Sequence, residues 1–161
     1  MEIFVRHPLR DDLAGLHALH DEIHRLHVAA VPWMFRMPQP HTWTDDQLLE
    51  MVEDPAGLTL VAEVGGEIAG LVTAAVRHIP DRRDMNPHPY VYVDTLVVGE
   101  KWHRQGVGRA LMEAIHIWAR EQEIDSVALG VWCFNTGAIA FYEELGYEAI
   151  EQRMRKTLND E

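Results

Sequence analysis

The sequence is poor in cysteine, in basic residues and in long apolar runs. Its 161 residues contain one cysteine, Cys133, so no disulfide can form within the chain, which fits a reducing cytoplasm. Against 26 acidic residues stand 14 lysines and arginines, and the net charge of −12 disfavours nucleic acid and acidic membranes as general partners. No stretch approaches the roughly 18 consecutive apolar residues of a membrane span, and we see no signal-peptide pattern at the start. We therefore expect a cytoplasmic protein whose partner is cationic.

The composition and length are those of an ordinary globular domain. Apolar residues make up 47% and charged residues 25% of the chain. The acidic charge is shared almost evenly between the two halves, and no internal repeat or low-complexity tract is visible. We predict a single domain over residues 1–161.

The order of apolar patterns predicts a mixed α/β fold. We expect strands at residues 3–6, 58–64, 67–78, 90–98, 126–132 and 147–156, and helices at about 13–26, 45–52, 107–122 and 135–145. Gly65-Gly66 marks a hairpin turn, Thr44 and Asn135 are helix caps, and Gly146 ends the last helix. A proline-rich loop, VPWMFRMPQPH, follows the first helix. The resulting sheet is antiparallel early in the chain, is flanked by helices and has β-α-β crossovers late in it.

The segment most suggestive of chemistry is KWHRQGVGR, residues 101–109. It carries three basic and no acidic residues between a buried strand and a helix, where Gly106 and Gly108 leave backbone N–H groups open to an anion. A basic loop with two turn glycines is the alternative. The order of residues excludes a P-loop, because Arg-Ala-Leu follows Gly108. It also excludes a dinucleotide-binding fingerprint, because Leu111 stands where the third glycine is required.

Two motifs in this order resemble the GNAT (general N-acetyltransferase) superfamily. They are YVYVDTLVVGEKWHRQGVGRALMEAIHIWAREQ and, further on, VWCFNTGAIAFYEELGY, which together span about residues 90–147. The resemblance implies a GNAT-like, mostly antiparallel sheet and acetyl-CoA as co-substrate. The chain departs from the family pattern at His103, where relatives usually have arginine or glutamine.

The resemblance also implies which residues hold acetyl-CoA. The turn and the start of its helix would bind the pyrophosphate, the preceding strand would offer main-chain groups to the pantetheine arm, and Asn135 would contact the cofactor as well as cap its helix. These cofactor-binding residues are Leu96, Val97, Val98, His103, Arg104, Gln105, Gly106, Val107, Gly108, Arg109 and Asn135.

Acetyl transfer to an amine needs a base for the ammonium proton and an acid for the leaving thiolate. By resemblance Tyr142 is the acid, although its ring could also serve packing alone. Asp94 interrupts an apolar strand, and this carboxylate is either the general base or a group without a catalytic role, in an ion pair or on a solvated face. Both alternatives stay open at this point.

Two further clusters bear on the acceptor. Trp33 and Phe35 lie in the proline-rich loop, where they could wall the acceptor site, form a dimer contact or simply pack. His17, His20, His24 and His27 form a stripe on the first helix, but nothing completes a metal site, and we predict no bound metal.

We therefore expect an acetyl-CoA-dependent N-acetyltransferase acting on a primary amine, a cationic small molecule or a protein amine, with a homodimer as the assembly suggested by similar folds. The main alternative is a non-catalytic acyl-CoA-binding sensor or regulatory module. A zinc hydrolase built on the histidine stripe ranks last.

Overall fold

The computed structural model describes residues 1–37 and 41–159, and the chain divides into two compact units, Met1–Gly130 and Val131–Glu161. Pro38 and Pro40 of the predicted loop lie outside the described residues.

The first unit contains a five-stranded sheet in the order β1-β2-β3-β4-β5. Its strands are β1 (Phe4–Arg6), β2 (Gly57–Val64), β3 (Glu67–Ile79), β4 (His88–Val98) and β5 (Val127–Leu129). Neighbours from β1 to β4 are antiparallel, whereas β5 is parallel to β4 because helix α3 (Val107–Glu121) carries the chain back. The predicted mixed sheet is confirmed, with one β-α-β crossover among the described residues.

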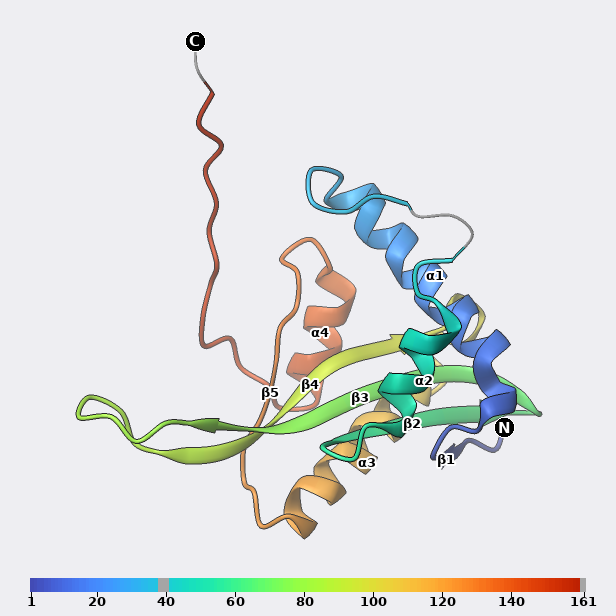
Figure 1. The fold of residues 1–161 in the computed structure, drawn as a ribbon, viewed down its shortest axis with the longest axis horizontal. Coiled ribbons are helices and arrows are strands. Elements are labelled where there is room, and N and C mark those ends of the chain that lie inside the picture. Colours follow the sequence, from blue (N-terminus) through green and yellow to red (C-terminus); the bar gives the residue numbers. More distant parts are fainter. Residues whose placement is uncertain (38–40, 160–161) are drawn as a thin grey trace. The chain divides into compact units, whose positions relative to one another are not determined.

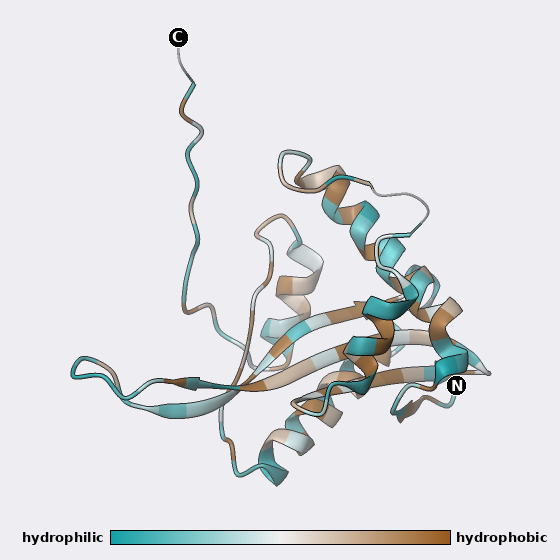
Figure 2. Ribbon diagram, viewed as in Figure 1, coloured by the Kyte–Doolittle hydropathy of each residue, from teal (hydrophilic) through white to brown (hydrophobic). Residues whose placement is uncertain are grey.

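Helices cover both faces of this sheet (Figure 1). Helices α1 (Leu13–Ala30) and α2 (Asp45–Glu53) lie on one face and α3 lies on the other. Leu16 and Leu19 of α1 pack with Leu48 of α2 against Val61, Leu71 and Val97 of the strands. On the opposite face α3 approaches so closely that a Cβ atom at Gly70 would lie 3.0 Å from Leu111 Cδ1. Apolar strand residues accordingly lie between the helices (Figure 2).

The turn and cap predictions agree with the structure. Gly65 and Gly66 join β2 to β3 with φ angles of 58° and 86°, which favour glycine. The Thr44 side chain accepts the N–H of Gln47 at 3.3 Å and caps α2. Beyond β2, the far halves of β3 and β4 continue as a two-stranded arm, visible in Figure 1.

The pairing of β4 changes at Asp94. Thr95 is opposite Thr73, but the next pair along β3 is Ala74 with Val93, so Asp94 is an extra residue in β4. The parallel pairing with β5 covers Val91, Tyr92 and Val93 and ends there. A bulge of this kind re-aims side chains and interrupts pairing. The pairing of β4 with β5 therefore ends next to Asp94, and we call this point the opening between the two strands.

The second unit contains α4 (Thr136–Glu144), capped by the Asn135 side chain, which accepts the N–H of Ala138 at 3.1 Å. Gly146 follows the helix with φ 91°, as predicted. The strand predicted over residues 147–156 is wrong, because residues 147–159 form neither helix nor strand. Its apolar side chains Ile150, Met154 and Leu158 are exposed, and within the described residues no strand pairs with this segment to bury them. The strand predicted over 126–132 is shortened to β5.

Candidate active site

The last residues of β4 present main-chain groups on an open edge. The N–H of Gly99 donates to Ala69 O at 2.9 Å, so alternation turns the main chain of Val97 toward β3 and that of Leu96 and Val98 away from it. Among the described residues, no strand pairs with this edge beyond Val93. An extended ligand could therefore hydrogen-bond to the main chain of Leu96 and to the N–H of Val98, whereas the Val98 carbonyl already accepts from His103. Val97 contributes its buried side chain to the core.

A tight turn connects this edge to α3. A short 3-10 helix, Glu100–Trp102, is followed by Arg104 and Gly106 with φ angles of 58° and 88°. A Cβ atom at Gly106 would meet only Ile3 Cδ1, at 3.8 Å, so glycine is needed there for its conformation rather than for space. The chain enters α3 directly, at Val107.

The start of α3 suits an anion. The first N–H groups of a helix have no partner within it, and they carry the positive end of the helix dipole. Here they belong to Val107, Gly108 and Arg109, next to a glycine turn and to the cation Arg104. These residues fit the pyrophosphate group that the sequence motif predicts.

Two of the side chains that we predict to bind the cofactor form hydrogen bonds within the turn. The His103 ring donates from Nε2 to Val98 O at 2.8 Å, and Gln105 Nε2 donates to Lys101 O at 2.8 Å. Lys101 in turn forms an ion pair with Glu67 at the start of β3. The structure thus gives His103 and Gln105 a role in shaping the turn. A direct contact of either with the cofactor stays a prediction.

Asp94, at the bulge, is bound by an arginine that the sequence analysis missed. Arg77 Nη2 lies 2.6 Å from Asp94 Oδ1, and the Arg77 guanidinium lies 4.0 Å from the centre of the Tyr92 ring. The ion pair was one of the alternatives for Asp94, beside a solvated face and the base role, and the base role stays a prediction. No sequence signal links positions 77 and 94, because their contact depends on the β3–β4 register and the bulge.

Tyr142 lies in α4 of the second unit, among aromatic rings. Its ring centre is 5.3 Å from that of Phe141 and 5.7 Å from that of Tyr147. Burial raises the pKa of Tyr142 to about 12, so the phenol keeps its proton at every ordinary working pH. This is the protonation state that a proton donor requires.

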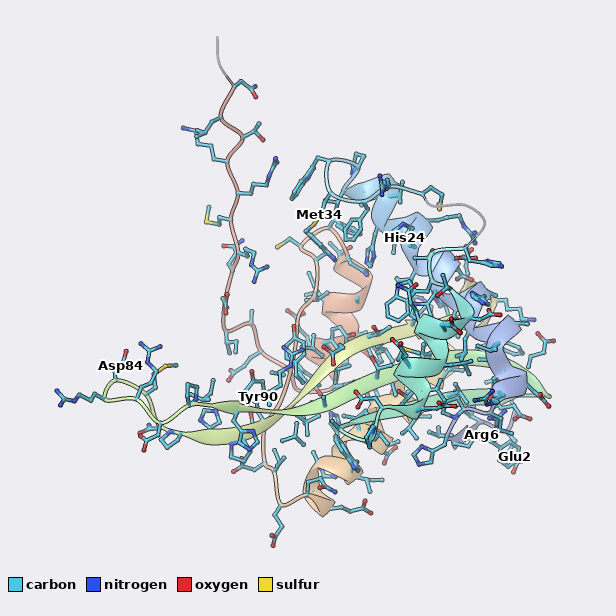
Figure 3. All side chains as sticks on the ribbon, in the orientation of Figure 1. Glu2, Arg6, His24, Met34, Asp84 and Tyr90 are labelled. Carbon is cyan, nitrogen blue, oxygen red and sulfur yellow. The ribbon has the colours of Figure 1, made fainter. Side chains whose placement is uncertain are left out.

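The histidine stripe holds the segment that follows α1. His24 Nε2 donates to Arg36 O at 2.7 Å, and the His27 ring stacks on Phe35 at 5.1 Å. Figure 3 labels His24 on the helix and Met34 on that segment. Phe35 therefore packs against α1, whereas Trp33 is exposed.

Nearer the start of α1, the stripe contacts residues at the beginning of α2 and just before it. His17 Nε2 lies 2.5 Å from Asp45 Oδ1, and His20 stacks on Trp43 at 4.7 Å. Within residues 1–37 and 41–159, no three His, Cys, Asp or Glu side chains are grouped so that they could hold a metal ion. The stripe is thus used in tertiary packing.

Comparison with known proteins identifies the family. The model of the acetyltransferase (GNAT) family matches residues 17–147. The chain belongs to the GNAT family. The Escherichia coli L-amino acid N-acetyltransferase AaaT is 27% identical over 150 residues, which cover 91% of this chain and 83% of that protein.

Solved structures agree with this assignment. A tetramutant of the Bacillus halodurans BH1408 protein is 27% identical, with a TM-score of 0.90 over 96% of this chain and 99% of that one. The protein AAC(6')-Iy, solved in complex with the bisubstrate analogue CoA-S-monomethyl-acetylneamine, is 17% identical and shares the fold, with a TM-score of 0.73 over 99% of this chain and 100% of that one. Within the described residues, no helix has the length and apolar character needed to cross a membrane.

Proposed function

We propose that this GNAT protein is an acetyl-CoA-dependent N-acetyltransferase that acts on a primary amine. The observation that carries the proposal is the opening of β4 from β5 at Asp94, directly upstream of the glycine turn and the start of α3. An extended edge that leads into an anion site matches a ligand with an amide-containing arm and a pyrophosphate. The name of the E. coli relative, an amino acid N-acetyltransferase, supports an amine as the acceptor.

The edge of β4 and the start of α3 would hold the co-substrate. Acetyl-CoA brings the acetyl group as a thioester, which is already activated toward an amine. The main chains of Leu96 and Val98 would hold its pantetheine arm. The N–H groups of Val107 and Gly108, with Arg104 and Arg109, would hold the pyrophosphate. We also keep the predicted contact of Asn135, whose side chain caps α4.

In the proposed transfer, the acceptor ammonium first loses a proton to the Asp94 carboxylate, directly or through a water molecule. The amine lone pair then forms the new C–N bond at the thioester carbonyl carbon, and the C–S bond breaks. The Tyr142 hydroxyl gives its proton to the departing sulfur, so coenzyme A leaves as the free thiol. The nitrogen of the new amide then gives up its second proton, which returns to the Tyr142 oxygen directly or through a water molecule and restores the hydroxyl. The raised pKa of Tyr142 supports this role because it keeps the donor proton in place.

Calorimetry followed by a thiol-release assay tests this proposal. Acetyl-CoA should bind the purified protein with micromolar affinity, whereas ATP and NAD, the controls, should not bind. Free thiol should then appear when amines are added. Binding without thiol release from any amine would instead support the acyl-CoA sensor, and no binding would refute both functions. A cytoplasmic location, a homodimer and a single domain over residues 1–161 stay predictions.

A further inference from the structure

Arg77 and Asp94 form a half-exposed ion pair beside the opening between β4 and β5. Their side chains are 47% and 42% exposed, and Arg77 Nη2 lies 2.6 Å from Asp94 Oδ1. We propose that an α-amino acid acceptor binds between these two side chains in place of their mutual contact. Its ammonium would pair with Asp94 and its carboxylate with Arg77. This inference rests on the proposed function and names its substrate class.

The position of Arg77 follows from the strand. Side chains alternate along β3, so Arg77 projects from the same face as Leu71 and Thr73, the face that α1 and α2 cover farther along. Arg77 lies where β3 has passed its last pair with β2, Ala75 with Gly57. Its guanidinium is 4.0 Å from the centre of the Tyr92 ring, which supports it while leaving the group open to solvent.

The pair borders the place where the transfer would occur. Asp94 is the extra residue of the bulge, directly after the last β4 residue that pairs with β5. Tyr92 reaches toward the other side of the opening, because a Cβ atom at Gly130, the residue after β5, would lie 3.1 Å from the Tyr92 hydroxyl. Arg77, Tyr92 and Asp94 therefore form one surface beside the opening.

An α-amino acid matches this surface in charge and in size. Its ammonium and carboxylate are attached to the same carbon, so they can meet two oppositely charged side chains that already touch. Arginine binds carboxylates through two parallel hydrogen bonds. Exposed ion pairs contribute little to stability, so exchanging the internal pair for two ligand contacts costs little free energy.

The same geometry argues against acceptors that carry only amines. A polyamine or an aminoglycoside has no carboxylate for Arg77, and a second cation would lie close to the guanidinium and be repelled. Among the cationic acceptors predicted from the acidic composition, the pair thus selects those whose amine is next to a carboxylate.

Kinetics with matched acceptors test the proposal. The pairs are L-leucine with 3-methylbutylamine, L-phenylalanine with 2-phenylethylamine, L-lysine with cadaverine and L-histidine with histamine, each amine lacking only the carboxylate. We expect thiol release to favour at least one amino acid over its amine by about tenfold or more in kcat/KM, as for a hydrogen-bonded charge pair.

Variants then assign this preference to Arg77. Arg77→Gln should lower kcat/KM for the amino acid about 10- to 100-fold, mainly through KM, and change that for the amine less than about threefold. Arg77→Lys should recover part of the loss, because it keeps the charge but not the paired donors. Arg82→Gln, which removes a charge near the tip of the same arm, is the control and should change nothing. The affinity for acetyl-CoA, measured by calorimetry, should be equal in all four proteins.

The amino acid assignment would be overturned if every amine reacted as fast as its amino acid or faster. It would also be overturned if Arg77→Gln lowered kcat/KM equally for the amino acid and its amine. Either result would leave the proposal of acetyl transfer intact. Failure of the proposed function gives a different result: no thiol release from any amine by the wild-type protein, which overturns this inference as well.

Discussion

His103 donates a hydrogen bond from Nε2 to the carbonyl oxygen of Val98, five residues earlier, at 2.8 Å. Since a carbonyl only accepts, the Nε2 atom must carry the proton. The Val98 carbonyl lies on the open edge of β4, so the histidine occupies the last acceptor of that edge and ties the strand to the turn before α3. Arginine and glutamine, the residues that the GNAT motif pattern has at this position, also carry side-chain N–H donors.

This contact predicts different effects for two substitutions at position 103. His103→Gln keeps a donor for the Val98 carbonyl, and its affinity for acetyl-CoA should stay within about twofold of wild type. His103→Ala leaves that carbonyl without its partner and should weaken binding about fivefold, the value of one neutral hydrogen bond. Calorimetric titration with acetyl-CoA measures both, and equal losses would show that the imidazole itself contacts the cofactor.

The two glycines of the turn should respond differently to substitution. Gly106 has φ 88°, so Gly106→Ala should lower the free energy of unfolding by about 1 kcal/mol. Gly108 lies inside α3, where leucine favours the helix by about 0.5–1 kcal/mol relative to glycine. Gly108→Leu should therefore fold well but lose at least about tenfold in acetyl-CoA affinity, because its side chain would fill the phosphate position. Urea unfolding and calorimetry separate these effects, and unchanged affinity in Gly108→Leu would refute the anion site.

Local features of the fold could be predicted from the sequence because their causes are local. The Gly65-Gly66 turn and the Thr44 and Asn135 caps depend on a few adjacent residues, and all three are where the sequence places them. The segment 147–156 has apolar residues suited to a strand, but a strand also requires a neighbour, and the sequence does not provide that information.

The candidate site divides in the same way. The glycine turn and the start of α3 form one continuous segment, and the sequence predicts both. The bulge at Asp94 and its contact with Arg77 depend on how two strands pair, and one shifted residue changes which side chains meet. The sequence therefore predicts an anion site but not the arginine beside the candidate base.

The proposed proton donor predicts a change in turnover without a change in binding. Tyr142→Phe keeps the ring and removes the hydroxyl, so kcat should fall about 100-fold, as for loss of a general acid, with acetyl-CoA affinity within about twofold. Tyr147→Phe is a matched control, because its ring is a neighbour of Tyr142 and burial raises its pKa to about 12 as well. Thiol release and calorimetry provide the two readouts. Full activity in Tyr142→Phe, or an equal loss in the control, would remove the acid role from Tyr142.

The buried histidines predict how stability depends on pH. His20 is 5% exposed and stacks on Trp43. Burial outweighs the opposite effect of the Asp21 charge and, with a smaller contribution from His17, lowers the pKa of His20 below the usual 6.5. Burial lowers the pKa of His27 in the same direction. Below pH 6.5 the unfolded chain therefore binds protons that the folded protein does not, and the free energy of unfolding falls as the pH decreases.

The magnitude of this loss can be bounded and assigned to one side chain. Each such histidine can lower the free energy of unfolding by at most about 1.4 kcal/mol per pH unit below 6.5, until the folded protein also takes up the proton. His20→Phe keeps a ring against Trp43 but cannot titrate, so urea unfolding at about pH 7.5 and 5.5 should show a smaller loss than in wild type. Identical losses in the two proteins would mean that protonation of other groups destabilises the fold in acid, and His20 would then act through packing alone.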